Sequence, residues 1–207
     1  MPQRIIRSLG VVLMLLLAAC NAAAQATEPP RTALAYRADL IRAARAVWGL
    51  DAPIAVFAAQ VHQESGWRPH AVSAVGAQGM AQFMPATSSW ISDLYPDLAA
   101  NTPFNPSWAL RALVTYDHWI YARVKAADAC QRMAMTLSAY NGGLGWISRD
   151  ARLASSKGLD PLIWFGSVET VNAGRSAANW RENRDYPRRI LHLHQPRYAS
   201  WGPGACQ

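Results

Sequence analysis

The chain has 207 residues, of which 51% are hydrophobic and 16% are charged, and it contains nine tryptophans. This composition suits one compact domain and excludes a disordered chain. The formal net charge of +7 favours contact with an acidic polymer, but it does not choose between nucleic acid, anionic lipid and a cell wall.

The N-terminus has the pattern of an export signal. Two arginines precede an apolar run over 11–19, which is too short to span a bilayer but has the length of a signal h-region. The run ends in LAAC, which resembles the lipobox of bacterial lipoproteins and implies lipidation of Cys20. Residues 24–26 (AQA) offer a competing site for ordinary signal cleavage. We expect residues 1–19 to be a signal peptide, of the lipoprotein type in preference to the soluble type, and the mature protein to be periplasmic and membrane-anchored.

The mature chain is expected to begin with a tether and to continue as one domain. Residues 20–31 are rich in alanine and end in two prolines and an arginine, so residues 32–207 are assigned to the folded domain. In an oxidising compartment Cys130 and Cys206 could form a disulfide or remain free thiols, and the sequence leaves both open. The sequence contains no CxxC motif or Cys/His cluster, so we expect neither a metal nor another cofactor.

After the tether the apolar residues follow a helical period, with no β-alternation of any length. Residues 95–106 form a proline-rich connector, and residues 155–179 are irregular. The predicted domain is therefore mainly α, with little or no β-sheet. Helices are expected from Thr32 to Trp48, from an Asp51 N-cap through Glu64, around Met80 to Met84, from Pro85 to Leu94, from Asn105-Pro106 to about Ala127, from about Gln131 to Tyr140, and from near Pro187.

Glu64 is the first candidate for a catalytic group. It follows Ile54, Phe57 and Val61 at steps of three and four residues, so it falls at the edge of an apolar helical stripe. Desolvation at such an edge favours the protonated carboxyl and suits a general acid, although a solvent-exposed glutamate is the simpler alternative. The loop over 65–82 is rich in Ser, Gly and Gln, which permit close backbone approach and hydrogen bonds to sugar hydroxyl or acetamido groups.

Three motifs, in this order, resemble those of the family 1 lytic transglycosylases, whose domain is called the SLT domain. The first is ESGWRP at 64–69, continued by GAQGMAQFMP at 76–85. The second is AYNGG at 139–143, and the third is Glu-x-x-x-Tyr at 182–186. The resemblance covers residues 45–195 and implies a lysozyme-like fold with a substrate cleft.

The resemblance also implies the roles of individual residues. Two positions depart from the family pattern, because Ala81 replaces a bulkier apolar residue and Pro187 replaces the usual valine. We expect Pro187 in the first turn of the last helix, where proline costs no hydrogen bond. The implied site consists of Glu64 as the catalytic acid/base, Tyr186 as its partner, Ser73, Gln82 and Met84 in the sugar groove, and Tyr140 and Asn141 on the opposite wall.

The family's reaction cleaves the MurNAc–GlcNAc β-1,4 bond of peptidoglycan without water. One glutamate protonates the glycosidic oxygen and then takes the proton of the MurNAc C6 hydroxyl, which closes a 1,6-anhydro ring. The absence of Asp and Glu between Ser65 and Ser92 agrees with this scheme, because glycoside hydrolysis uses two carboxylates. A hydrolytic muramidase of goose-lysozyme type, with Asp93 or Asp97 as second acid, is one alternative. A catalytically idle wall-binding module is another.

The expected partner is the peptidoglycan glycan strand, bound by a monomer. Trp67 and Trp146 adjoin the motifs and are the candidates for sugar stacking. The arginines near the C-terminus lack an aromatic ladder, so we expect no nucleic-acid binding. His62 fits only half of a zinc deaminase signature, and His192 and His194 are too close in sequence to form an i, i+4 metal pair. A cell-envelope machine is a further candidate partner.

Overall fold

The computed structural model describes residues 28–206. The expected signal peptide (1–19), the lipidation candidate Cys20 and most of the tether lie outside these residues. Within 28–206, no helix is long and apolar enough to cross a membrane.

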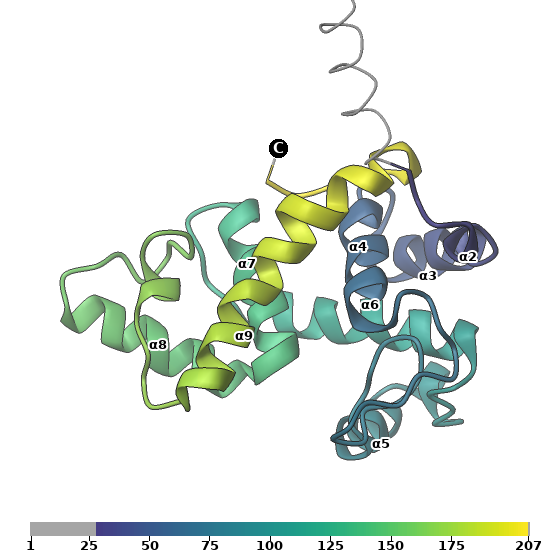
Figure 1. Ribbon diagram of the computed structural model, residues 1–207, viewed down its shortest axis with the longest axis horizontal. Helices are drawn as coiled ribbons and strands as arrows, with labels where there is room; N and C mark the ends of the chain where they lie inside the picture. Colours follow the sequence, from purple (N-terminus) through teal and green to yellow (C-terminus); the bar gives the residue numbers. More distant parts are fainter. Residues whose placement is uncertain (1–27, 207) are drawn as a thin grey trace, which may run out of the picture.

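Helices make up the framework of the domain (Figure 1). The only β-type pairings among the described residues are two isolated bridges, Val72 with Gln78 and Gln78 with Phe83. The prediction of a mainly α fold is therefore confirmed. The elements are α2 (Arg31–Leu34), α3 (Arg37–Trp48), α4 (Ile54–Ser65), α5 (Pro85–Leu94), α6 (Pro106–Tyr121), α7 (Ala129–Gly142), α8 (Leu144–Ser156) and α9 (Ala177–Arg188), with 3-10 turns η1 (Pro96–Leu98), η2 (Val168–Thr170) and η4 (Gln195–Trp201) and a π-helical turn η3 (Arg189–His194).

Helix α4 is the centre of the core. Nine of its twelve residues are buried, because every position of IAVFAAQV except Gln60 is apolar and the apolar residues cover all faces of the first two turns. The sequence predicted an apolar stripe on one face of this helix, whereas all faces of its first two turns are buried. Only the last turn, with His62, Gln63 and Glu64, is partly exposed. The central helix thus carries its one polar stretch to the edge of the core.

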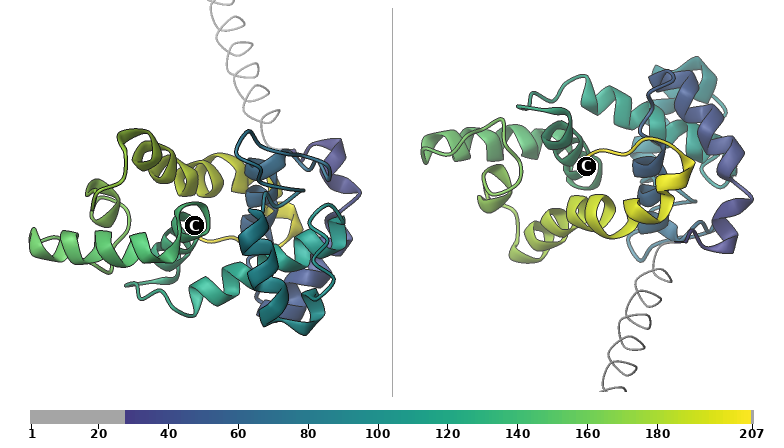
Figure 2. Two further views of the ribbon diagram at one scale, coloured as in Figure 1. Left: turned by 90° about the horizontal axis from the view of Figure 1, so that it is seen from below. Right: turned by 90° about the horizontal axis from the view of Figure 1, so that it is seen from above.

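The other helices lie on two sides of this centre. Helices α7, α8 and α9 lie on one side and α2, α3 and α5 on the other (Figure 2). Helix α6 packs against both α3 and α7 and so joins the two sides, while η3 and η4 pack directly on α4. Helix α4 is therefore held from both sides, which positions its last turn between them.

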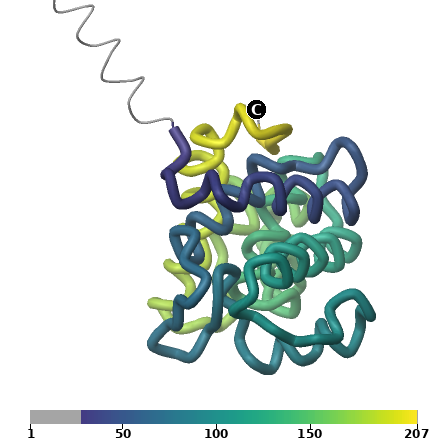
Figure 3. The backbone as a smooth tube through the Cα atoms, turned by 90° about the vertical axis from the view of Figure 1, so that its right-hand side faces the viewer, coloured from purple at the N-terminus to yellow at the C-terminus, as the bar shows by residue number. Residues whose placement is uncertain are grey.

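The two ends of the described chain lie side by side (Figure 3). Arg37 donates to the Ser200 carbonyl at 3.3 Å, and its guanidinium lies 5.7 Å from the Trp201 ring centre. The C-terminal tail then crosses α4 and ends at Cys206, which is disulfide-bonded to Cys130 in the first turn of α7. The tail thereby ties the two sides of the domain together.

Several predicted helix boundaries were wrong. The helix expected over 32–48 breaks at Ala35 and Tyr36, between α2 and α3. Asp51 does not cap α4, which begins at Ile54 without a side-chain cap. Residues 80–84 form a turn instead of a helix, because the backbone of Gln78 pairs with that of Phe83.

The middle of the chain contains one more helix than expected. Helix α6 has the predicted Asn105 N-cap but ends at Tyr121, and α7 begins at Ala129 after an Asp128 cap. The Gly142-Gly143 stop signal does end α7, yet helix α8 follows immediately. Gly143, at φ +94°, turns the chain without a loop.

Pro187 does not lie in the first turn of the last helix. Helix α9 begins at Ala177, after Ser176, whose side chain accepts a hydrogen bond from the Asn179 amide. Pro187 is the last residue but one of α9, and it cannot donate to the carbonyl four residues earlier. The π-helical turn η3 follows directly, which is a usual consequence of an interrupted hydrogen-bond ladder.

Candidate active site

A cleft of about 390 Å³ lies beside the last turn of α4, and we call it the Glu64 cleft. Its walls come from α4, the loop between α4 and α5, the start of α5, and helices α6, α7 and α9. The structure brings all seven residues of the expected site into this one cleft: Glu64, Ser73, Gln82, Met84, Tyr140, Asn141 and Tyr186.

Glu64 and Tyr186 are in direct contact at the base of the cleft. The Tyr186 hydroxyl donates a hydrogen bond to Glu64 Oε1. Tyr186 is buried in α9, and burial raises its pKa well above the usual value, so it remains a donor at all ordinary pH values. Because Oε1 is held by this bond, Oε2 is the oxygen of Glu64 that is free to carry an exchangeable proton.

Burial raises the pKa of Glu64 to about 8, and the negative charge of Glu182 adds to the increase. The hydrogen bond from Tyr186 acts in the opposite direction, because it favours the carboxylate. At pH 7 a group with this pKa is protonated in about nine-tenths of the molecules. Glu64 can therefore give up a proton at neutral pH and accept one back, as a general acid/base must.

The loop after α4 is fixed to the end of that helix. Ser65 Oγ donates to the Met80 carbonyl at 2.8 Å and accepts from the Arg68 amide at 3.2 Å. Gly79 is required by a close approach, because a Cβ there would lie 1.8 Å from the Pro103 carbonyl oxygen. Its φ of +73° also lies in the left-handed region. The motif residues Ser65 and Gly79 thus build the wall of the cleft without facing it.

Gln82 and Ser73 are held by the loop that they belong to. Gln82 donates through Nε2 to the carbonyls of Gly79 (2.8 Å) and Ala71 (3.3 Å), which leaves Oε1 to accept from a ligand. Ser73 Oγ accepts from the Ala77 amide at 2.9 Å, so its hydroxyl hydrogen is available to donate. The wall therefore offers one acceptor and one donor in fixed positions.

The opposite wall depends on α9 as well as on α7. The Tyr140 hydroxyl donates to the Ala81 carbonyl at 2.7 Å, which connects α7 to the loop after α4. Asn141 Oδ1 accepts from Asn183 Nδ2 at 3.0 Å, and Asn183 is itself fixed by Ser138. A Cβ at Gly142 would lie 2.6 Å from Asn183 Nδ2, so the glycine of the AYNGG motif permits this contact.

Asn183 belongs to a buried polar network that holds α8 and α9 together. Its Oδ1 accepts from Arg184 Nη1 at 2.7 Å, and Arg184 and Arg175 both contact the Asp150 carboxylate. Two of the C-terminal arginines are therefore structural.

Glu182 is a cleft residue that the sequence analysis did not identify as one. It lies on α9, one turn before Tyr186, and its side chain lines the cleft in an exposed position. The signal that could have found it is the first position of the Glu-x-x-x-Tyr motif, because residues four apart share a helix face. Among residues 28–206, Glu64 and Glu182 are the carboxylates that line the cleft.

The two acids considered for the hydrolytic alternative lie elsewhere. Asp93 is exposed near the end of α5, and Asp97 pairs with Arg111 at 2.8 Å. Neither residue lines the Glu64 cleft.

One further acid, Asp117 on α6, is completely buried behind the cleft. Burial raises the pKa of Asp117 well above its usual value, and the charge of Glu64 adds to the increase. Gln60 Nε2 donates to Asp117 Oδ1 at 3.5 Å. Asp117 Oδ2 and Gln60 Oε1, both buried, have no other hydrogen-bond partner in the described structure. A neutral Asp117 suits this environment, because burying a carboxylate without a cationic partner costs far more than burying a carboxyl group.

The two tryptophans expected to stack on sugar do not line the cleft. Trp67 is 1% exposed and donates to the Tyr198 hydroxyl at 2.7 Å, within a cluster of aromatic rings. The guanidinium groups of Arg149 and Arg175 both lie over the Trp146 ring, at 4.7 and 4.9 Å from its centre. The first expectation failed because Gly66 ends α4 and turns the chain back toward the core.

Two histidines at the edge of the core, His62 and His194, contact each other. His62 and His194 stack with ring centres 4.4 Å apart, and burial lowers the pKa of His194 to about 4. Burial also lowers the pKa of His62, whose Nδ1 lies 2.8 Å from the Tyr198 hydroxyl. Over residues 28–206, His, Cys, Asp and Glu side chains form no group of three that could hold a metal ion.

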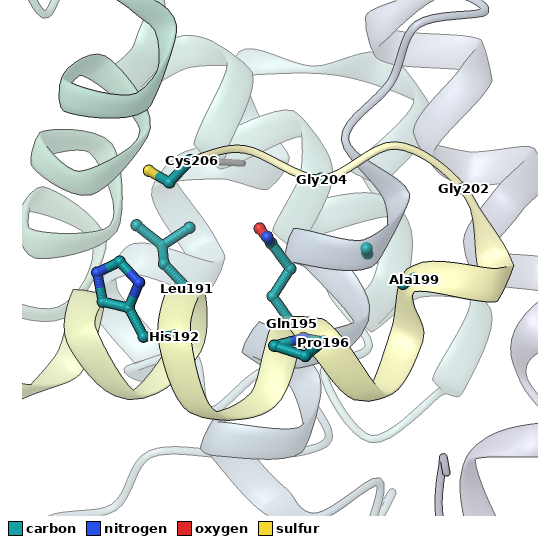
Figure 4. A pocket seen from close by; sticks show the side chains of 9 residues that line it. Leu191, His192, Gln195, Pro196, Ala199, Gly202, Gly204 and Cys206 are labelled. Carbon is teal, nitrogen blue, oxygen red and sulfur yellow. The ribbon is translucent and has the colours of Figure 1, made fainter. Parts of the chain in front are cut away.

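A second cavity, of about 330 Å³, lies under the C-terminal tail (Figure 4). His192, Gln195, Gly204 and Cys206 are among its lining residues. The Gln195 amide both donates to and accepts from the backbone of Ala205, at 2.8 and 3.0 Å. The cavity is thus a packing feature of the tail and contains no pair of acid and base groups. We assign the candidate active site to the Glu64 cleft.

The profile of the transglycosylase SLT domain family matches residues 39–163. A membrane-bound lytic murein transglycosylase F from Pasteurella multocida is 31% identical over 111 residues, which are 53% of this chain and 21% of the relative. The protein of the same name from Shewanella loihica is 31% identical over 108 residues, 52% of this chain and 21% of the relative. The chain thus spans about a fifth of the length of these relatives.

The fold is similar to that of the 70 kDa soluble lytic transglycosylase from Escherichia coli. The two structures superpose with a TM-score of 0.53 at 20% sequence identity, over 78% of this chain and 24% of the other. The similarity confirms the expected lysozyme-like fold.

Proposed function

The chain belongs to the transglycosylase SLT domain family, and from this premise we propose that it is a lytic transglycosylase that cleaves the MurNAc–GlcNAc β-1,4 bond of peptidoglycan and leaves 1,6-anhydroMurNAc ends. The observation that carries the proposal is the position of the Glu64 carboxyl, which Tyr186 holds in a cleft of polar and aromatic side chains and whose pKa is raised by burial to about 8. Such a group can donate and accept a proton in one turnover.

In the proposed reaction Glu64 acts twice. Its Oε2 first donates a proton to the glycosidic oxygen, the bond from that oxygen to C1 breaks, and the GlcNAc hydroxyl leaves. Glu64, now a carboxylate, takes the proton of the MurNAc C6 hydroxyl while O6 forms a bond to C1. The proton lost in the first step is regained in the second, so neither water nor cofactor is consumed.

The cleft residues orient the substrate in this scheme. Gln82 Oε1 accepts from a sugar hydroxyl or acetamido N–H, and Ser73 donates to a sugar oxygen. Tyr140 and Asn141 form the facing wall, and Met84 contributes a half-exposed apolar surface. Tyr186 prevents rotation of the Glu64 carboxyl between the two proton transfers. All these groups come from one chain, which supports a monomer as the active unit.

A hydrolytic muramidase is the second candidate, and one observation favours it. Glu182 supplies a second carboxylate to the cleft, as an enzyme that activates water would require. The position of Glu182 on the exposed rim of the same helix as Tyr186 instead suits an electrostatic role, since its charge raises the pKa of Glu64.

The proposal is tested by digesting purified peptidoglycan and identifying the new ends by mass spectrometry. The lytic transglycosylase yields anhydro ends, and these are lost in Glu64→Gln, which keeps the size of the side chain but cannot donate a proton. New reducing ends would identify the hydrolase instead. Absence of any product from the wild-type protein would favour an idle wall-binding module.

We propose that the protein acts in the periplasm, anchored to a membrane. The relatives are named membrane-bound murein transglycosylases, and the N-terminal sequence has the pattern of a lipoprotein signal. We propose that residues 32–207 form the catalytic domain, tethered by residues 20–31 to a lipid on Cys20. Mass spectrometry of the mature N-terminal peptide, in the wild type and in Cys20→Ala, tests this anchor.

A further inference from the structure

Two tryptophans outside the Glu64 cleft continue its aromatic lining. Trp90 on α5 is 38% exposed, and its ring meets that of Trp119 on α6 at 4.9 Å and 81°. Tyr116, which lines the cleft, lies 5.9 Å from Trp90 and 6.2 Å from Trp119. An aromatic surface thus runs from the cleft wall to the outside of the domain.

The positions of these residues on their helices show the same continuity. Thr87 lines the cleft from the first turn of α5, and Trp90 follows it by three residues, so both lie on one face of that helix. Tyr116 and Trp119 are also three residues apart, on α6. Two separate helices therefore carry side chains from the cleft in the same direction.

Core packing accounts for only part of this arrangement. Tyr116 and Trp119 are half-buried and pack against the hydrophobic core, and the guanidinium of Arg123 covers the Trp119 ring at 3.9 Å from its centre. Trp90 is not among the side chains packed on that core, and it exposes more than a third of its surface although its neighbour Ile91 is buried. Trp90 is therefore the ring of this group with an open surface, and Trp119 supports it through an edge contact.

We propose that Trp90, supported by Trp119, forms an additional sugar-binding subsite, in which the Trp90 ring stacks on a pyranose ring of the glycan strand beyond the two sugars at the scissile bond. The inference rests on the proposed function. A glycan strand is long and must leave the cleft over a neighbouring surface. The C–H groups on one face of a pyranose ring are apolar and pack on an aromatic ring, as apolar rings do on one another.

The probe for this subsite is a series of β-1,4-linked GlcNAc oligomers, from dimer to hexamer, titrated by calorimetry into the Glu64→Gln protein. Adding Trp90→Ala is expected to weaken binding of the hexamer about three- to tenfold, the usual size of one aromatic contact, and to leave the dimer unchanged. Trp119→Ala should act in the same direction. Trp90→Phe, which keeps an aromatic ring, should restore most of the affinity.

Phe104→Ala is the matched control, because Phe104 is an aromatic residue of similar exposure (37%) that does not line the cleft. It should bind every oligomer like its parent, and thermal unfolding of each variant checks the fold. Equal losses for dimer and hexamer, no loss for either, or no hexamer binding by Glu64→Gln would each overturn the subsite. An unchanged saccharide affinity would direct the search to a protein partner for this surface.

This experiment separates the subsite from the proposed function. The wild-type digest reports on the reaction, and the titration of an inactive variant reports on binding alone. In the wild-type background, Trp90→Ala should raise KM for long glycan strands several-fold and leave kcat almost unchanged. If anhydro ends form but these parameters do not depend on Trp90, the subsite is wrong and the function stands.

Discussion

The pKa of Glu64 results from effects that oppose each other. Burial and the charge of Glu182 favour the neutral acid, whereas the hydrogen bond from Tyr186 favours the carboxylate, and the result is a pKa of about 8. The acid is the form that starts the proposed reaction, so kcat/KM should fall as the pH rises through about 8. Substitution of Glu182 or of Tyr186 should shift the pH at which kcat/KM falls.

Glu182→Gln tests the electrostatic role of the second cleft carboxylate. Removing its negative charge lowers the pKa of Glu64, so the alkaline fall in kcat/KM should move to lower pH. Activity below pH 6 should change less than about tenfold, because the proposed reaction does not use Glu182 to activate water. The measurement is a pH profile of anhydro-product formation. Loss of all turnover at every pH would indicate that Glu182 belongs to the chemistry.

Tyr186→Phe should move the alkaline fall in kcat/KM in the opposite direction, to higher pH. Without the phenolic donor the carboxylate of Glu64 is less stable, so its pKa rises and the alkaline limit moves to higher pH. The freed carboxyl also rotates, and kcat should fall about 10- to 100-fold, the size expected for a hydrogen bond to a charged group. A pH profile of this variant beside Glu182→Gln provides the comparison, and shifts of the same sign in both would refute this account of Glu64.

At the scale of elements, the cleft depends on how the loop after α4 and helix α6 are held. Ser65 and Gln82 form hydrogen bonds to the backbone of the loop, and Gly79 permits its close approach to Pro103. Much of the first motif therefore stabilises the loop that forms one wall of the cleft. Asp117 and Gln60 connect α6 to α4 behind that wall. Changes at these positions should act on the site through structure.

Gly79→Ala tests whether a residue that supports the loop, without lining the cleft, affects activity through the position of the loop. A Cβ at this position meets the Pro103 carbonyl at 1.8 Å, and the backbone has φ +73°, so the loop must shift. We expect a loss of stability of about 1–3 kcal/mol and at least a tenfold loss of kcat/KM, because Ser73 and Gln82 move with the loop. Thermal unfolding and peptidoglycan digestion measure the two effects. Gly145→Ala is the control, since a Cβ there meets nothing within 4 Å.

Asp117→Asn should stabilise the protein at neutral pH. The pKa of Asp117 is raised in the folded state, so the native protein binds more protons than the unfolded chain above about pH 4. Stability due to this residue is therefore lost as the pH rises. An amide of the same shape removes this dependence, so we expect a higher free energy of unfolding at pH 7 and little change at pH 3. Urea unfolding at both pH values measures the effect, and a loss of stability at pH 7 would contradict a raised pKa of Asp117.

The limits of the sequence prediction are clearest at this scale. Glu64, Ser73 and Gln82 lie close together in the sequence, and the motif that contains them is local. Tyr186 contacts Glu64 across 122 residues, and only the resemblance to a family brought the two together. Glu182 was missed because its place in the cleft depends on the packing of α9. Helix α8 was missed because a Gly-Gly stop signal also permits an immediate new helix.

At the scale of the whole molecule, the C-terminal tail holds the two sides of the domain around α4. The Cys130–Cys206 disulfide closes a loop of 76 residues and joins the tail to the start of α7. Either cysteine replaced by serine should lower stability by up to about 4 kcal/mol, because the unfolded chain gains conformational freedom. Thermal unfolding with and without dithiothreitol measures this loss. An unfolding temperature that does not respond to reduction would contradict it.

In the proposed reaction the C6 hydroxyl of the substrate, and not water, attacks C1. Digestion of peptidoglycan in H₂¹⁸O, followed by mass spectrometry of the released muropeptides, distinguishes the two nucleophiles. We expect anhydro products without ¹⁸O, formed only by the protein with an intact Glu64. Products that carry one ¹⁸O at C1 would mean that water is the nucleophile and that the protein is a hydrolase.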